Sequence, residues 1–127
     1  MAIERVDRPW GYYLVLHEED GHKVKQFVLK PGSRLSLQRH RRRSELWQVV
    51  RGEAEVTRGK EIVRLPPGGS IHIPLGVLHR VGSVGKENLV VIEVQMGDYL
   101  GEDDIERFED DYGRAATVAS VNAPKMK

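Results

Sequence analysis

The sequence predicts a single all-β domain, built as a small barrel or sandwich of short strands. Turn-forming residues recur about every 8–12 residues along the chain, a spacing typical of such folds. No long segment before residue 100 has the hydrophobic period of a helix. The chain has 127 residues, 39% of them hydrophobic, so it is long enough for one core and too short for two full domains.

The expected strands lie between breaks that are rich in glycine and proline. Pro31-Gly32, Arg51-Gly52 and Pro66-Pro67-Gly68-Gly69 are the clearest of these turn signals. Residues 35–40 alternate between apolar and polar side chains, which is the pattern of a strand with one buried face. The predicted strands cover residues 24–29, 35–40, 46–50, 54–58, 61–65, 70–73, 77–81 and 89–95.

The end of the chain carries a different pattern. Residues 101–112 are acidic, and Glu102, Asp103 and Asp104 would favour the first turn of a short C-terminal helix. We expect the acidic side chains of this segment to face solvent; the alternative is that they dock against basic residues of the barrel or of a partner chain. The domain should cover residues 1–114, with residues 115–127 as a loosely ordered tail.

Composition and charge argue against several classes of protein. The net charge is +1, and the basic run at residues 39–43 divides between the two faces of a strand, so we expect no nucleic-acid partner. No apolar run reaches the roughly 20 residues of a membrane span, and none resembles a signal peptide. The sequence therefore predicts a soluble cytoplasmic protein with no membrane partner. It has no cysteine, so any metal must bind through other side chains.

Four polar residues form the most informative set. Gln38 and His40 are two positions apart on one expected strand and so share a face. Glu45 follows after a short turn, and His79 lies in a separate strand beyond a Pro-x-Gly turn. Inside a small barrel these side chains can converge, and their mixed nitrogen and oxygen donors suit Zn, Mn, Fe, Co or Ni.

The same residues belong to two motifs with fixed spacing. They read Gly32-x5-Gln38-x-His40-x4-Glu45-x6-Gly52 and Gly68-x5-Pro74-x-Gly76-x2-His79. Their order and spacing resemble the two motifs of cupins. Gln38 replaces the usual first His, and Ser83 stands where the second motif usually has Asn. The resemblance implies a single cupin barrel, the double-stranded β-helix or jelly-roll fold.

Further blocks resemble one cupin family in particular, across roughly residues 8–114. They include Arg8-Pro9-Trp10-Gly11, Arg43-x-Glu45-x-Trp47, Ile92-Glu93-Val94-Gln95 and the run that begins at Tyr99. This pattern resembles type II phosphomannose isomerase, the C-terminal isomerase domain of the bifunctional mannose-1-phosphate guanylyltransferase/mannose-6-phosphate isomerase family. Leu46 stands where that family usually has His. The sequence holds no Gly-rich nucleotide-binding segment, so we do not expect guanylyltransferase activity from it.

The resemblance implies interconversion of mannose 6-phosphate and fructose 6-phosphate, which supplies nucleotide-sugar and polysaccharide synthesis. It implies one divalent metal ion, zinc first and Mn, Co, Fe or Ni otherwise, on Gln38, His40, Glu45 and His79. Such chemistry also needs a base and a set of cations for the phosphate. The phosphate candidates are Arg43, Arg80, Lys25 and Arg114. The catalytic candidates are Lys25, Arg43, Glu93 and Tyr99, with His72 as a further choice for the base.

Two other functions stay open. The absence of the family's His at Leu46 is compatible with a non-catalytic, metal-containing module or subunit that binds a sugar phosphate. A third hypothesis is another cupin chemistry such as metal-dependent oxygenation, because one fold hosts many activities. Since exposed strand edges in a small barrel favour pairing, we expect a homodimer.

Overall fold

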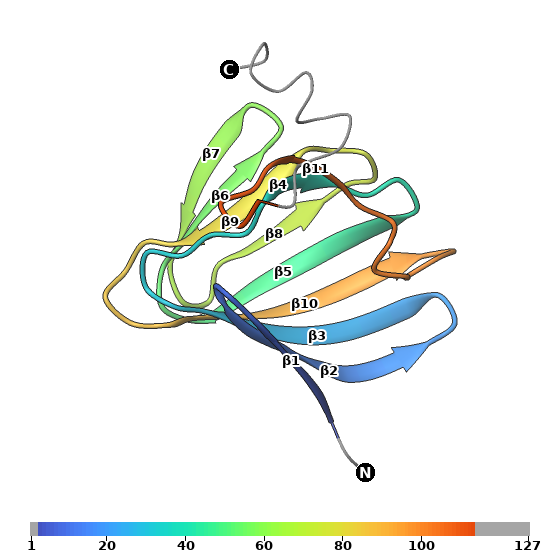
Figure 1. Ribbon diagram of the computed structural model, residues 1–127, viewed down its shortest axis with the longest axis horizontal. Helices are drawn as coiled ribbons and strands as arrows, with labels where there is room; N and C mark the ends of the chain where they lie inside the picture. The colour runs from blue at the N-terminus through green and yellow to red at the C-terminus, as the bar shows by residue number, and fades with distance from the viewer. Residues whose placement is uncertain (1–2, 114–127) are drawn as a thin grey trace.

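The computed structural model describes residues 3–113, which form two antiparallel β-sheets packed against each other (Figure 1). None of these residues is helical, so the expected all-β fold is confirmed. The part of the chain that the structure describes contains no helix able to cross a membrane. The predicted tail at residues 115–127 lies outside the described residues.

The two sheets divide the strands unequally. In the order of their pairing, the six-stranded sheet contains β1 (Glu4–Arg8), β2 (Gly11–Glu19), β3 (His22–Leu29), β10 (Leu89–Gly97), β5 (Arg43–Arg51) and β8 (Ser70–Ile73). The five-stranded sheet contains β11 (Glu106–Glu109), β4 (Leu37–Arg39), β9 (His79–Ser83), β6 (Ala54–Arg58) and β7 (Glu61–Leu65). All eight expected strands are present in whole or in part, whereas β1, β2 and β11 were not predicted.

The prediction of a short helix at residues 101–112 is wrong. This segment contains a loop followed by β11, which pairs with β4. The negative charge of the acidic side chains is stabilised by cations of the barrel and not by the N-terminus of a helix. Glu106 accepts hydrogen bonds from Arg39 at 2.9 Å and from Arg41 at 2.7 Å, and these two arginines lower its pKa to about 2. The alternative of docking against basic residues of the barrel is the correct one for Glu106.

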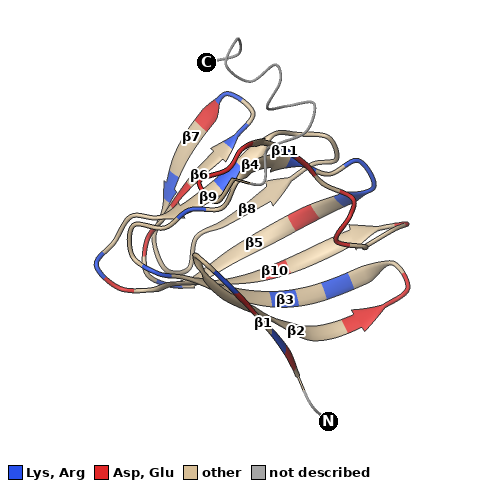
Figure 2. Cartoon of the chain, in the orientation of Figure 1, with Lys and Arg blue, Asp and Glu red and all other residues tan. Residues whose placement is uncertain are grey.

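The side chains on the interior face of the large sheet change from apolar to polar along its strands. Toward one end it is apolar, with Phe27 on β3, Trp47 and Val49 on β5 and Val91 on β10 in the hydrophobic core. Toward the other end, alternate inward positions become polar and remain buried: Lys25 and Lys23, Glu45 and Arg43, Glu93 and Gln95. Figure 2 shows blue segments on β3 and a red segment on β5, with β10 between the two strands. The fold therefore places a polar chamber beside the core.

Candidate functional site

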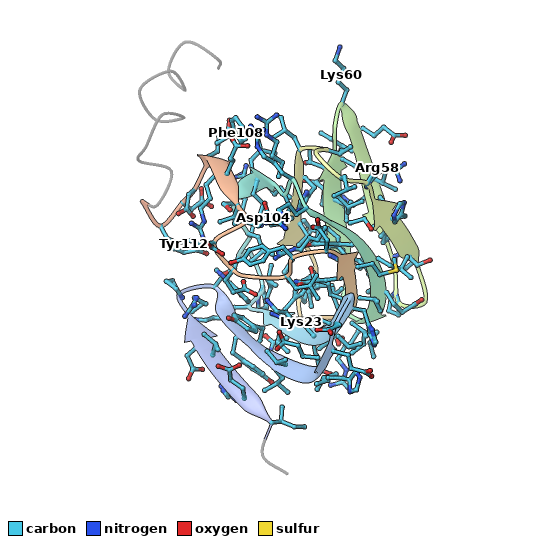
Figure 3. All side chains as sticks on the ribbon, turned by 90° about the vertical axis from the view of Figure 1, so that its right-hand side faces the viewer. Lys23, Arg58, Lys60, Asp104, Phe108 and Tyr112 are labelled. Carbon is cyan, nitrogen blue, oxygen red and sulfur yellow. The ribbon has the colours of Figure 1, made fainter. Side chains whose placement is uncertain are left out.

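The polar chamber is a cavity of about 140 Å³ between the two sheets. The connection from β10 to β11 crosses this end of the barrel, at the right-hand side of Figure 1, and we refer to residues 98–105 as the strap. Figure 3 looks onto the same end, with Asp104 of the strap and Lys23 of β3 labelled. The polar and charged residues that line the cavity are Arg8, Lys25, Ser36, Gln38, His40, Arg43, Glu45, Glu93, Gln95, Glu102 and Arg107.

Three of the four predicted metal ligands come together at the wall of this chamber, which His40 and Glu45 line and His79 does not. His40 follows β4, His79 begins β9 in the same sheet, and Glu45 reaches across from β5 in the opposite sheet. Nε2 of His40 lies 3.2 Å from Oε2 of Glu45, and Nε2 of His79 lies 3.8 Å from Oε1 of Glu45. All three donor atoms lie within 4.8 Å of one another, and all three side chains are buried. This is the donor set of a divalent-metal site.

The two histidines are oriented and neutral, as metal ligands must be. Nδ1 of His40 donates to the carbonyl of Asp104 at 2.7 Å, and Nδ1 of His79 donates to the carbonyl of Val77 at 3.0 Å. These bonds select the tautomer whose Nε2 lone pair faces the cluster. Burial, with Arg43 and His79 nearby, lowers the pKa of His40 to about 4, and burial also lowers the pKa of His79. Among the described residues, Nε2 of His79 has no hydrogen-bond partner.

Gln38 and Arg43 complete the surroundings of this cluster. Gln38 is opposite His79 in the β4–β9 pairing, is buried, and lines the cavity, so its side chain lies on the same face of the sheet as His79. Arg43 donates from Nε to Glu45 at 2.8 Å and from Nη2 to His40 Nε2 at 3.2 Å. The lone pairs of the cluster thus already attract one cation, which fits the proposed binding of a metal ion.

Glu93 is the second buried carboxylate of the chamber. Trp47 Nε1 donates to Glu93 at 2.9 Å and to Glu45 at 3.1 Å, and Gln95 Nε2 donates to Glu93 at 2.9 Å. Burial raises the pKa of Glu93 to about 7, and the neighbouring Glu45 adds to this rise. A carboxyl group with a pKa near neutrality is suited to exchange a proton at physiological pH.

Several cations face the cavity, including some that the sequence did not suggest. Lys25 and Arg43 were predicted, and both line it. Arg8, from the end of β1, and Arg107, from β11, also line it but were not predicted as site residues. Arg8 belongs to the Arg-Pro-Trp-Gly block at residues 8–11, and this block is the sequence feature that could have indicated Arg8 as a site residue. No local pattern marks Arg107, because the pairing of β11 with β4 brings it to the site.

Other predicted site residues lie elsewhere. Arg80 follows His79 and points away from it, donating to the Leu35 carbonyl at 2.9 Å and to the Glu109 carboxylate at 3.0 Å. Tyr99 is on the exposed side of the strap, where its hydroxyl bonds to Asp103. His72 is exposed on β8. None of these three lines the cavity, and Arg114 is outside the described residues.

The two departures from the family pattern are also away from the chamber. Leu46 alternates with Glu45 and Trp47, so its side chain is on the outer face of the large sheet and 39% exposed. Ser83 is buried near the far end of β9, in the pair with Ala54, and does not line the cavity. Neither departure removes a side chain from the site.

Comparisons with known proteins all point to the same family. Residues 2–110 match the family described as Mannose-6-phosphate isomerase C-terminal. The chain is 54% identical over 110 residues to the "Xanthan biosynthesis protein XanB" of Xanthomonas campestris pv. campestris, covering 87% of this chain and 24% of that protein. It is 49% identical over 114 residues to the "Alginate biosynthesis protein AlgA" of Pseudomonas aeruginosa (90% and 24%). It is 48% identical over 109 residues to the "Mannose-1-phosphate guanylyltransferase" of Escherichia coli strain K12 (86% and 23%). The chain spans about a quarter of the length of these curated relatives.

Solved structures support the fold. The capsular polysaccharide assembling protein CapF of Staphylococcus aureus matches with a TM-score of 0.74 at 18% identity, over 86% of this chain and 32% of that chain. The Cnp3 cupin domain of Schizosaccharomyces pombe matches with a TM-score of 0.66 at 17% identity, over 68% of this chain and 61% of that chain. The predicted cupin barrel is therefore confirmed.

Proposed function

Because this chain belongs to the Mannose-6-phosphate isomerase C-terminal family, we propose that it interconverts mannose 6-phosphate and fructose 6-phosphate. The observation that carries the proposal is the buried cluster of His40, Glu45 and His79, of which His40 and Glu45 line the same cavity as Glu93. Aldose–ketose isomerisation moves a proton between C1 and C2 of the sugar through an enediol-type intermediate. It therefore needs a group to polarise the carbonyl and a group to carry the proton.

We assign the metal to His40, Glu45, His79 and Gln38. A bound divalent ion would act as a Lewis acid toward the carbonyl and hydroxyl oxygens of the sugar. The four side chains supply one formal negative charge, so a divalent ion would keep a net positive charge in this site. Zinc is our first choice of metal, and Mn, Co, Fe and Ni are compatible with the same donors.

We assign the proton transfer to Glu93. Of the candidates Glu93, Lys25, Tyr99 and His72, only Glu93 and Lys25 line the cavity. Lys25 donates to Glu102 at 2.6 Å, so its Nζ is already engaged as a donor in an ion pair with the strap. Glu93 has a pKa raised to about 7 by burial and by Glu45, so it can accept and return a proton near neutral pH.

The remaining assignments concern binding and biological setting. The cations that line the cavity outnumber its carboxylates, four to three, which favours an anionic substrate. The relatives are named for xanthan and alginate biosynthesis and for guanylyltransferase activity, so we propose that the product supplies sugar-nucleotide and polysaccharide synthesis. Location in the cytoplasm and assembly as a homodimer stay predictions. The departure at Leu46, which motivated a non-catalytic module, is outside the cavity and gives that alternative no support.

A coupled assay for fructose 6-phosphate tests the proposal. The purified chain, treated with a chelator and then supplied with Zn, Mn, Co, Fe or Ni singly, should form product only after one of the metals is added. His79→Ala should form none with any metal, while Glu55→Gln, on the distant β6–β7 hairpin, should match the wild type. Tight binding of mannose 6-phosphate without turnover under all metals would reject the isomerase in favour of a binding module.

A further inference from the structure

Two lysines of β3 are buried under the strap. Lys23 and Lys25 are two positions apart, so both point into the barrel, and each is only 6% exposed. Lys25 Nζ lies 2.6 Å and Lys23 Nζ 3.6 Å from the same oxygen of Glu102, which belongs to the strap. Buried lysines are costly unless an anion is close, so this pair forms a built anion site occupied by the carboxylate of the chain itself.

A third buried cation extends the site toward the metal cluster. Arg43 is 6% exposed and lines the same cavity as Lys25 and Glu102. Its Nη1 has no hydrogen-bond partner among the described residues. Burial by itself would raise the pKa of Glu102, but Lys25, Arg43 and Lys23 hold it below its usual value. Lys25 and Lys23 thus share the Glu102 carboxylate, Lys23 also lies 3.6 Å from Glu18, and Nη1 of Arg43 stays available for a further anion.

The carboxylate of Glu102 can leave without the strap moving. Its side chain is 54% exposed, so rotation toward solvent costs little packing. The strap has its own anchors on either side: Lys23 Nζ donates to the Leu100 carbonyl at 3.1 Å, and Asp104 accepts from the backbone N–H groups of Arg41 and Arg42, each at 3.0 Å.

We propose that Lys23, Lys25 and Arg43 form a subsite for a phosphate monoester, and that Glu102 is a resident competitor which the phosphate displaces. Naming a sugar phosphate as the ligand rests on the proposed function, whereas the anion subsite does not. A dianionic phosphate has more charge and more acceptor oxygens than one carboxylate, so it can replace Glu102 on the lysines. A neutral sugar has no charge with which to compete for the lysines, so its binding should not depend on the Glu102 carboxylate.

Calorimetric titration of the whole chain with inorganic phosphate, mannose 6-phosphate and mannose tests this proposal. Glu102→Gln removes the competing charge, and we expect phosphate and mannose 6-phosphate to bind about five- to tenfold more tightly, which corresponds to about 1 to 1.4 kcal/mol. Mannose should bind equally to both proteins. The matched control is Glu55→Gln, another glutamate in an ion pair, with Arg64 on the β6–β7 hairpin, and it should change nothing.

Two results would overturn the proposal. Phosphate binding that is unchanged or weaker in Glu102→Gln would overturn the proposal, because a merely structural glutamate does not compete. Tighter binding of all three ligands alike would also overturn it. Lys23→Met should weaken phosphate binding, and thermal unfolding of each variant shows that it remains folded. If phosphate binding responds as expected but no fructose 6-phosphate forms in the coupled assay, the subsite stands and the isomerase proposal fails.

Discussion

Replacing Glu93 by glutamine should make the metal-free protein more stable at neutral pH while removing its catalysis. The carboxyl group is buried, and burial with the nearby Glu45 raises its pKa from 4.5 to about 7. Between these pH values the folded protein holds a proton that the unfolded chain releases, so folding becomes less favourable as the pH rises. Glutamine cannot ionise and escapes this cost.

The magnitude follows from the pKa difference. At about 1.4 kcal/mol per pH unit, ionising buried Glu93 costs up to about 3 kcal/mol at pH values above 7. In Glu93→Gln the bond from Trp47 would remain, because the new amide oxygen can accept it. The new amide N–H can donate to Gln95 Oε1, which has no hydrogen-bond partner among the described residues, once the Gln95 amide turns over. The exchange of Glu for Gln therefore replaces the unpaired Gln95 Oε1 by an unpaired Gln95 Nε2, and the number of unpaired buried Gln95 atoms stays the same.

Urea unfolding followed by tryptophan fluorescence, in the presence of a chelator, measures this effect. The stability difference between Glu93→Gln and wild type should be near zero at about pH 4.5 and grow to its full value above about pH 7. The low pKa of His40 makes stability rise with pH in both proteins, and because the charge of Glu93 raises that pKa, the rise should be somewhat larger in Glu93→Gln. Turnover with metal restored should fall by about 10²–10⁴-fold. A variant that is less stable than wild type at pH 8 would refute this account of Glu93.

Five further substitutions test the same contacts. His40→Ala and His79→Ala should each lose stoichiometric metal in elemental analysis after dialysis; retention by both would mean that the site is elsewhere. Asp104→Ala should weaken metal binding about 10- to 100-fold in a competition titration, because Asp104 positions the carbonyl that orients His40. Trp47→Phe should lower the free energy of unfolding by about 1–3 kcal/mol, since two buried carboxylates lose a donor. Arg80→Met should reduce stability without changing phosphate affinity, and a loss of that affinity would restore Arg80 as a phosphate ligand.

Local sequence patterns predicted most of the strands and failed where partners are distant. The segments around β3 to β10 have alternating side chains bounded by glycine and proline, and these signals are contained in a few neighbouring residues. The structure of the acidic stretch at residues 101–112 depends instead on Arg39 and Arg41, which are more than 60 positions away. The acidic residues favour the start of a helix locally, but ion pairs and β-pairing in the folded chain stabilise a loop and a strand instead.

The candidate site was predicted to a similar extent. Motif spacing led to His40, Glu45 and His79, because strand alternation and the turns between strands determine which way they point. The same alternation could have excluded Arg80, which is next to His79 and therefore on the opposite face. Tyr99 illustrates the other limit, because an irregular strap has no period from which the direction of a side chain can be inferred. Arg107 reaches the cavity only through the pairing of β11 with β4.

The strap has a consequence for the order of events during folding. His40 is oriented by the carbonyl of Asp104, 64 residues later, and Lys25 is bound by Glu102, 77 residues later. Contacts this far apart in sequence form only after large loops have closed, and such closure is slow. A chain still emerging from the ribosome would thus expose His40 long before the strap could select its tautomer. Metal capture becomes a late step, and its rate should follow the docking of the strap rather than the collapse of the barrel.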